Sequence, residues 1–402
     1  MKMYKKAILP TGFKANGLAC GIKKSGKLDL ALFYSVLPAK ASCQFTTNKI
    51  QAAPIKINKR HLKGNRYFQA IIVNSGNANC FTGNLGIKDA EETTKVLADN
   101  LGIKKESILV SSTGIIGKRL PLFKIKKAIP ELVEGLSWQG IGKAKRAVMT
   151  TDTFTKEMTV KFNLGERIIS ICGVAKGAGM IAPNMACPER THSTPLRVRP
   201  ELVEGRSRGA TMLVFILTDA NITQRALDKA LDIVIDNSFG CITVDGCMST
   251  NDSVMLLANG ASGNNSIDLN KNFKPFVKAL NLVCLELAKM IIRDAEGATK
   301  FIQIKAAGAI NFAEAKKIAL SIANSNLFKT AMYGENPNFG RIMAAAGASG
   351  IDIKEKDLKI KASPLNKKEI KVNVSIGRGH ASAVVYTSDL TPEYIRINAG
   401  YN

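Results

Sequence analysis

The stretch that decides the fold is ATMLVFILTDAN at residues 210–221, in which an apolar run over 212–217 follows Thr211 directly. A continuous apolar run of this length between polar residues is typical of a strand buried on both faces of a sheet. The residues before it, GVAKGAGMIAPNMA at 173–186, are mostly small. Thr211 is therefore predicted at the start of a core strand, where packing holds its hydroxyl rigidly.

Two further buried strands are predicted upstream of this run. Residues 70–73 read AIIV, residues 108–110 read ILV, and each run leads into polar residues that include glycine. The first polar segment is NSGNAN at 74–79, and the second is SSTGIIG at 111–117. We interpret both as turns at strand ends, and a Ser/Thr/Gly turn such as the second can aim backbone N–H groups at an oxyanion.

The remaining pattern predicts a mixed fold. Short apolar runs alternate with turn residues over 7–60, which indicates a β-rich N-terminal portion, while residues 276–290 carry apolar side chains at helical spacing. A final strand is expected at 383–389, followed by a short tail over 394–402. No G-x-G-x-x-G motif follows a predicted strand, so a Rossmann-type fold is not expected. The predicted fold class is α/β, an α+β-type layered sandwich of mixed sheets with covering helices.

The composition is that of a packed globular protein. Of the 402 residues, 46% are hydrophobic and 22% are charged, and the length suggests about two to three domains. No apolar window is long enough for a membrane span, and the N-terminus lacks the apolar stretch of a secretory signal. We therefore expect a cytoplasmic protein with no membrane partner.

The formal net charge of +25 does not by itself indicate nucleic-acid binding. The excess is mostly lysine scattered along the chain, without the block of arginine, aromatic residues and glycine that recognition modules concentrate on one element. We interpret it as a basic surface that draws in anionic small molecules, with no nucleic-acid partner. Eight cysteines without a C-x-x-C pair and only three histidines support neither a metal site nor a disulfide framework.

The scarcity of histidine narrows the chemistry. No histidine has a nucleophile-elbow context, and no Walker loop, H-E-x-x-H or hydride-cofactor motif is present. The nitrogen of an internal threonine such as Thr211 is an amide and cannot act as a base. If the preceding bond is cleaved, the new α-amine, with a reference pKa of about 7.7–8.0, can take the hydroxyl proton. The alternative from the residues alone is a buried threonine that only bonds to its neighbours.

The order of motifs along almost the entire chain resembles the ornithine acetyltransferase (glutamate N-acetyltransferase) family of arginine biosynthesis. Members of that family cut themselves before a threonine that then carries the acetyl group. The matching motifs are PTGFKANG at 10–17, NSGNANCFTG at 74–83, SSTGIIG at 111–117, MTTDT at 149–153, KGAGMIAPNMA at 176–186, ATMLVFILTDA at 210–220, STNDSVMLLANG at 249–260, DAEGATKF at 294–301, GENPNFGRI at 334–342 and YIRINAGYN at 394–402.

The resemblance implies a role for each matching site residue. Thr211 is implied as the nucleophile, and the bond between Ala210 and Thr211 as the cleavage site. Thr113 and Gly114 are implied to stabilise the oxyanion. Substrate contacts are implied at Thr150, Lys176, Thr211, Glu296 and Asn398. Lys176 is suited to a substrate carboxylate, and Glu296 to an ammonium group such as that of ornithine.

The same resemblance implies a ping-pong mechanism without a cofactor. The Thr211 hydroxyl attacks the acetyl group of N-acetylornithine, ornithine leaves, and glutamate accepts the acetyl group to give N-acetylglutamate. Some relatives also use acetyl-CoA as a substrate, and no residue here decides that activity. The implied architecture is self-cleaving and N-terminal-nucleophile-like, with an alpha chain over 1–210 and a beta chain over 211–402. The two chains are expected to stay associated as a heterotetramer with two copies of each.

Three features depart from the family pattern. Residues 187–210 stand where family members run Asn-Met-Ala directly into Thr-Met-Leu, and they repeat the hexapeptide PELVEG of 130–135, as expected of an inserted, exposed low-complexity loop. The chain ends at Asn402, before the hydroxyl residue that family members usually place there, so one substrate contact is expected to be missing. Cys247 and Phe339 replace the usual Asp and Trp, which we expect to be tolerated.

Two other functions stay open. An autoprocessed amidase or aminopeptidase would use the same nucleophile with water as the acceptor. An uncleaved, inactive relative or basic binding protein would result if the insertion at 187–210 prevents self-cleavage.

Overall fold

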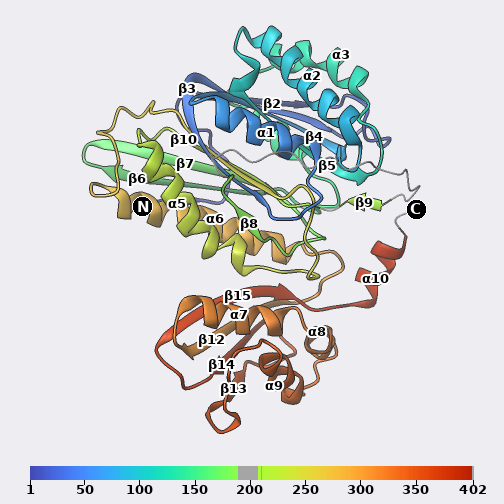
Figure 1. Cartoon of the computed structure of the whole chain (residues 1–402), viewed down its shortest axis with the longest axis vertical. Helices are drawn as coiled ribbons and strands as arrows, with labels where there is room; N and C mark the ends of the chain where they lie inside the picture. The colour runs from blue at the N-terminus through green and yellow to red at the C-terminus, as the bar shows by residue number, and fades with distance from the viewer. Residues whose placement is uncertain (189–206, 210, 401–402) are drawn as a thin grey trace.

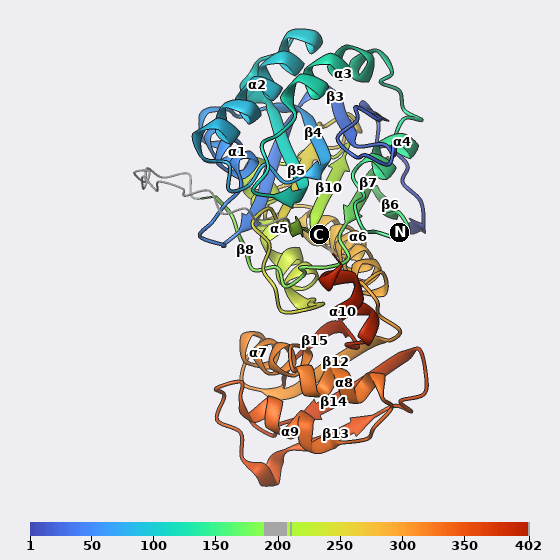
Figure 2. The same cartoon turned by 90° about the vertical axis from the view of Figure 1, so that its right-hand side faces the viewer.

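The computed structural model describes residues 1–188, 207–209 and 211–400. Within these residues the strands form an eleven-stranded sheet and a four-stranded sheet, each with helices packed on it. Figures 1 and 2 show the small sheet and its helices at one end of the molecule, next to the larger layered unit. The predicted mixed α/β class with layered sheets and covering helices is confirmed.

The large sheet contains strands from most of the chain. Its order is β1 (Lys2–Tyr4), β6 (Lys156–Leu164), β7 (Arg167–Lys176), β10 (Leu213–Thr218), β11 (Ser253–Ala258), β3 (Leu30–Thr46), β4 (Phe68–Asn77), β5 (Ile108–Ile116) and β9 (Ser207–Gly209), with β2 (Phe13–Leu18) and β8 (Met185–Ala186) paired to β3. Strand β10 is buried along its whole length, as predicted. It runs parallel to β11 and antiparallel to β7.

Strand β3 bends the large sheet into two layers. Residues 40–45 of β3 pair with β11, whereas residues 30–34 pair with β2 and β4. The two layers face each other across a shared core, in which Phe33 of β3 stacks on Phe215 of β10 at 5.1 Å between ring centroids. Because side chains alternate along a strand, the other face of β10 is free to pack on helices.

Helices cover both outer faces of this double layer (Figure 1). The face of β6, β7, β10 and β11 packs against α5 (Gln224–Asp236) and α6 (Phe273–Arg293). The face of β4 and β5 packs against α1 (Ala53–Gly64), α2 (Gly83–Leu101) and α3 (Leu122–Glu134), and α4 (Ile141–Ala147) packs on β2. Short 3₁₀ turns are η1 (Lys105–Ser107), η2 (Phe239–Cys241) and η3 (Glu355–Asp357).

The small sheet has its own core. Its order is β13 (Lys359–Ala362), β14 (Glu369–Ser375), β12 (Phe301–Ala309) and β15 (Ala381–Ser388), covered by α7 (Phe312–Ala323), α8 (Asn326–Tyr333) and α9 (Phe339–Gly347). After β15, helix α10 (Pro392–Ala399) runs back toward the large unit, as Figure 2 shows. The chain therefore returns its C-terminal residues to the layered sheets.

Strands β2 and β3 make the portion over 7–60 β-rich, as predicted, and helix α1 follows them after Ala52 with a proline in its first turn. Two local predictions are wrong. The predicted tail over 394–402 is largely helix α10, because Thr391 caps it through the N–H of Tyr394 and a proline again opens the helix. The two segments interpreted as turns, NSGNAN and SSTGIIG, begin as strand instead, since β4 and β5 continue side by side to Asn77 and Ile116.

Candidate active site

Thr211 lies two residues before the first residue of β10, and only 2% of its surface is exposed. Its Oγ1 lies 3.0 Å from the Oγ of Ser249. The next amide, Met212 N, donates a hydrogen bond of 2.9 Å to Oδ1 of Asp252. Ser249 and Asp252 belong to the segment that leads into β11, the parallel neighbour of β10. Because neighbouring parallel strands begin at the same edge of a sheet, this segment holds the Thr211 hydroxyl in place.

The two residues implied in oxyanion binding, Thr113 and Gly114, lie beside the chain that approaches Thr211. Gly114 of β5 pairs with Gly209 of β9, which precedes Thr211 closely in sequence. Gly114 has a φ of +132°, and a Cβ at this position would lie 2.3 Å from the carbonyl carbon of Gly76 in β4. Only glycine fits this backbone, so the strand is irregular where the oxyanion is expected.

Lys176 is the last residue of β7 and is fully buried. Its Nζ donates a hydrogen bond of 3.1 Å to Oγ1 of Thr113. Burial lowers the pKa of Lys176, while the nearby carboxylates of Asp152 and Glu296 act in the opposite direction. An ammonium group held beside Thr113 can pair with the carboxylate of a substrate.

A buried network of ion pairs lies next to Lys176. Lys156 Nζ donates a hydrogen bond of 2.6 Å to Oδ1 of Asp152 and a second hydrogen bond to Oδ2 of Asp294. Asp152 also accepts a hydrogen bond of 2.7 Å from the amide of Gly177, the residue after Lys176. Burial opposes ionisation, but the charges of Lys156 and Lys176 hold the pKa of Asp152 well below its usual range. The network thus links the end of β7 to the start of β6.

Thr150, a predicted substrate contact, lies next to this network. Its amide donates a hydrogen bond of 2.9 Å to Oδ2 of Asp152. Its Oγ1 is buried and has no hydrogen-bond partner among the described residues. Because a buried hydroxyl without a partner costs free energy, this oxygen is a good position for a polar atom of a bound ligand.

Glu296 and Asn398 meet although they are distant in sequence. Asn398 lies on α10, and its Nδ2 donates a hydrogen bond of 3.2 Å to Oε2 of Glu296. The amide of Glu296 donates to the carbonyl of Ala178 at 2.9 Å. A Cβ on Gly179 would lie 2.3 Å from Oε2 of Glu296. The glycine therefore lets this carboxylate lie close to the loop that follows Lys176.

Asp245 links the same loop to α10. Its carboxylate accepts hydrogen bonds from the amides of Met180 at 2.7 Å and Ile181 at 3.1 Å. The hydroxyl of Tyr394 on α10 donates to Asp245 Oδ2 at 3.2 Å. Burial and the charge of Asp245 raise the pKa of Tyr394, so its hydroxyl stays protonated as a donor.

The structure thus places Thr113, Gly114, Lys176 and Thr211 at one edge of the large sheet, with Thr150 and the pair Glu296 and Asn398 linked to Lys176 and its loop. Sequence reasoning missed the residues that position them, namely Asp152, Lys156, Asp245, Ser249, Asp252, Asp294 and Tyr394. Ser249 and Asp252 lie in the motif STNDSVMLLANG, so a signal for their segment was present. The pairing of the strand that follows, β11, with β10 was not predicted.

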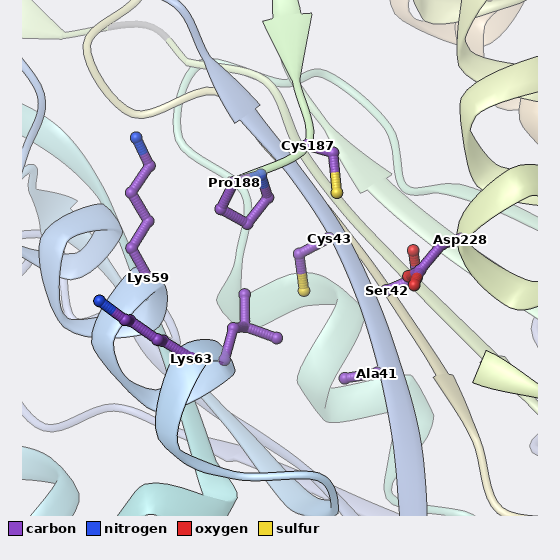
Figure 3. Close-up of a pocket in the computed structure, with 9 residues that line it drawn as sticks. Ala41, Ser42, Cys43, Lys59, Lys63, Cys187, Pro188 and Asp228 are labelled. Atoms are coloured by element: carbon purple, nitrogen blue, oxygen red, sulfur yellow. The ribbon is translucent and has the colours of Figure 1, made fainter. Parts of the chain in front are cut away.

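Two predicted features fall partly outside the described residues: Ala210, which completes the cleavage site, and residues 189–206 of the insertion. Cys187 and Pro188, which begin the insertion, are described. Figure 3 shows them at a cavity lined also by Cys43 of β3, Lys59 and Lys63 of α1 and Asp228 of α5. The site residues placed above are not among the described residues that line this cavity.

Residues 1–188, 207–209 and 211–400 contain no group of three or more His, Cys, Asp or Glu side chains that could hold a metal ion. No helix within these ranges is long and apolar enough to cross a membrane.

Comparison with known proteins gives concordant matches. The model of the ArgJ family matches residues 14–402. The arginine biosynthesis bifunctional protein ArgJ of Geobacter sulfurreducens is 40% identical over 412 residues, covering 97% of this chain and 98% of that protein. The protein of the same name from Dehalococcoides mccartyi is 42% identical over 417 residues, covering 98% and 96%. The crystal structure of ornithine acetyltransferase complexed with ornithine from Mycobacterium tuberculosis is 36% identical with a TM-score of 0.43, covering 46% of this chain and 99% of that one.

Proposed function

The chain belongs to the ArgJ family, and from this premise we propose that it transfers an acetyl group from N-acetylornithine to glutamate. Membership of this family makes the chain an acyltransferase of arginine biosynthesis. The observation that carries the proposal is the surroundings of Thr211. A buried hydroxyl at the start of a core strand lies at the same sheet edge as Thr113, Gly114 and Lys176.

The first step is self-cleavage of the bond between Ala210 and Thr211. Oγ1 of Thr211 attacks the carbonyl carbon of Ala210, the C–N bond breaks, and the nitrogen takes up the hydroxyl proton. Water then hydrolyses the resulting ester, which leaves a carboxylate on Ala210 and an α-amine on Thr211. The pairing of β5 with β9 supports this step because it holds the approaching chain beside Gly114.

The second step is acetyl transfer. The α-amine takes the proton of Oγ1 as this oxygen attacks the acetyl carbonyl of N-acetylornithine. The oxyanion is stabilised at Thr113 and Gly114, the amine proton passes to the departing ornithine nitrogen, and Thr211 is left as an acetyl ester. Glutamate then attacks this ester and leaves as N-acetylglutamate, so the cycle is ping-pong.

Substrate recognition follows from the charges at the site. Lys176 pairs with the α-carboxylate that ornithine and glutamate share, and Glu296 binds the side-chain ammonium of ornithine. The buried hydroxyl of Thr150 and the amide of Asn398 supply further polar contacts. No cofactor takes part in this scheme, and acetyl-CoA is a candidate second acetyl donor.

We further propose that the two cut chains stay together in the cytoplasm as a heterotetramer with two copies of each. The boundary between 1–210 and 211–402 falls inside the large sheet. Strand β7 of the first chain pairs with β10 of the second over six residues, from Leu213 to Thr218. Separation would expose the buried faces of both strands, so the association is stable.

The test combines intact mass with an acceptor assay. Cleavage predicts two species, residues 1–210 and 211–402, whereas Thr211→Ala should give one uncut chain without transfer activity. Incubation with N-acetylornithine and glutamate should produce N-acetylglutamate and ornithine. Acetate formed without N-acetylglutamate would show an amidase instead, and a wild-type chain that stays uncut and inactive would refute the proposal.

A further inference from the structure

The carboxyl group of Asp252 lies beside Thr211 and is only partly hydrogen-bonded within the described residues. The side chain is fully buried, and its Oδ1 accepts the hydrogen bond from Met212 N. Its Oδ2 is also buried but has no hydrogen-bond partner among the described residues. Burial raises the pKa of Asp252 to about 7, although the amides of Met212 and Ser249 and the charge of Lys176 lower it. A buried carboxyl oxygen without a hydrogen bond costs free energy, and a donor placed beside Oδ2 would remove this cost.

The position of this carboxyl indicates which group can donate a hydrogen bond to Oδ2. Oδ1 is fixed on the amide that directly follows Thr211. Adjacent residues lie about 3.8 Å apart along the chain, so the same carboxyl is within reach of the Thr211 nitrogen. In the uncut chain that nitrogen is an amide with one N–H. After cleavage it is an amine with more hydrogen atoms to donate.

We propose that Asp252 is a positioning residue for the α-amine of Thr211, with Oδ2 accepting a hydrogen bond from that amine after the chain is cut. The inference rests on the proposed function and deepens it. A neutral amine that donates one N–H to Oδ2 keeps its lone pair free to face Oγ1. Ser249 Oγ, 3.0 Å from Thr211 Oγ1, holds the hydroxyl in its place.

The carboxylate acts during each proton transfer. When the amine takes the proton from Oγ1, the ammonium that forms lies beside Asp252 and is stabilised by its negative charge. The proton then passes to the nitrogen of the departing ornithine, and the amine is neutral again. Lys176 and Asp245 are the other charged groups that act on Asp252, and neither is changed in the variants below.

Asp252→Asn tests the proposal, and Asp219→Asn is its matched control. The amide side chain in Asp252→Asn would keep an oxygen for Met212 N but would replace Oδ2 with an N–H donor. Asp219 lies at the opposite end of β10, is also buried, and accepts hydrogen bonds from the amides of Ser170 and Thr11. Burial raises its pKa as well. The two variants therefore remove similar buried carboxylates from the two ends of one strand.

We expect Asp252→Asn to be cut and to lose kcat by about 10- to 100-fold, part of the ~10²–10⁴ that general base catalysis supplies. The KM for N-acetylornithine should change much less. The acidic limb of the kcat profile should move to lower pH, because the amine pKa falls without the carboxylate. Asp219→Asn should keep kcat and that limb. Unchanged kcat and pH profile in a cut Asp252→Asn protein would overturn the proposal, as would a failure of only this variant to be cut.

A second measurement needs no change at Asp252. In Thr211→Ala protein, which is expected to stay uncut, the ¹³C-labelled carboxyl of Asp252 should keep its raised pKa. In the cut wild-type protein this pKa should be lower, because the α-amine of Thr211 is protonated at the acidic pH values of the titration and then stabilises the carboxylate. An equal pKa in both proteins overturns this inference alone, whereas a wild-type chain that intact mass shows to be uncut overturns the proposed function as well.

Discussion

Replacing Lys156 with Met should destabilise the protein strongly and in a pH-dependent way. The Lys156 ammonium and the carboxylates of Asp152 and Asp294 are buried, with side-chain exposures of 0%, 0% and 1%. Removing the cation leaves two buried carboxylates, although Lys176 and the amide of Gly177 still act on Asp152. Breaking a buried ion pair from one side costs about 3–5 kcal/mol, a large share of the ~5–15 kcal/mol that holds a typical protein folded.

The pH dependence follows from the pKa of Asp152. In the wild type this pKa is depressed, so the group contributes stability above its unfolded pKa and loses it as the pH falls through the folded value. In Lys156→Met the pKa of Asp152 rises, so the loss of folding free energy is greatest near neutral pH and shrinks as acid protonates this carboxyl. Urea unfolding of the uncut Thr211→Ala background, followed by circular dichroism between about pH 5 and 8, measures it.

The control is Lys126→Met, whose partner Glu92 lies 2.6 Å away on the surface with exposures of 42% and 35%. An exposed pair contributes at most about 1 kcal/mol, so this variant should unfold almost as the background does. A loss below about 1 kcal/mol in Lys156→Met, or a loss that does not change with pH, would refute the reasoning about the buried network.

Two further changes test the site itself. Gly114→Ala should lower kcat by about 10²–10³-fold, as loss of an oxyanion donor does, because its Cβ would displace the backbone of Gly76. The control is Gly165→Ala, which is also at positive φ but has open space around its Cβ and should keep full activity. Equal kinetics in the two variants would contradict the oxyanion role of Gly114. Glu296→Gln should raise the KM for N-acetylornithine by about 10- to 100-fold, equivalent to the ~1.5–3 kcal/mol of a hydrogen bond to a charged group. Steady-state kinetics with a truncated substrate that lacks the side-chain ammonium should show no such penalty, and an equal penalty would remove Glu296 from ammonium binding.

Sequence patterns were sufficient to predict a strand or helix where one hydrophobic pattern dominates the segment. Strand β10 follows from the unbroken apolar run after Thr211, and helix α6 from apolar side chains at helical spacing. The patterns failed where a short capping signal decides the structure. Thr391 and Pro392 are enough to begin helix α10, and missing them turned a helix that carries Asn398 into a predicted tail.

The resemblance names candidate site residues but not the residues that hold them in position. Motif resemblance points to Thr113, Lys176 and Glu296 one by one. It does not show that Lys156 is buried between two carboxylates, because a lysine in an amphipathic strand usually points to solvent. Long-range pairing also had no local signal, so the contact between Thr211 and Ser249 became visible only when β11 was placed beside β10.

The place of β10 in the large sheet makes self-cleavage at Thr211 depend on assembly of that sheet. This strand must insert between β7, made earlier in the chain, and β11, made later, before Thr211 has both of its neighbours. Under the proposed function, a chain that misassembles its sheet does not cut itself and never gains the α-amine that serves as its base. Activity then depends on correct folding, because only a chain that has assembled its sheet cuts itself, and a misfolded chain stays inactive.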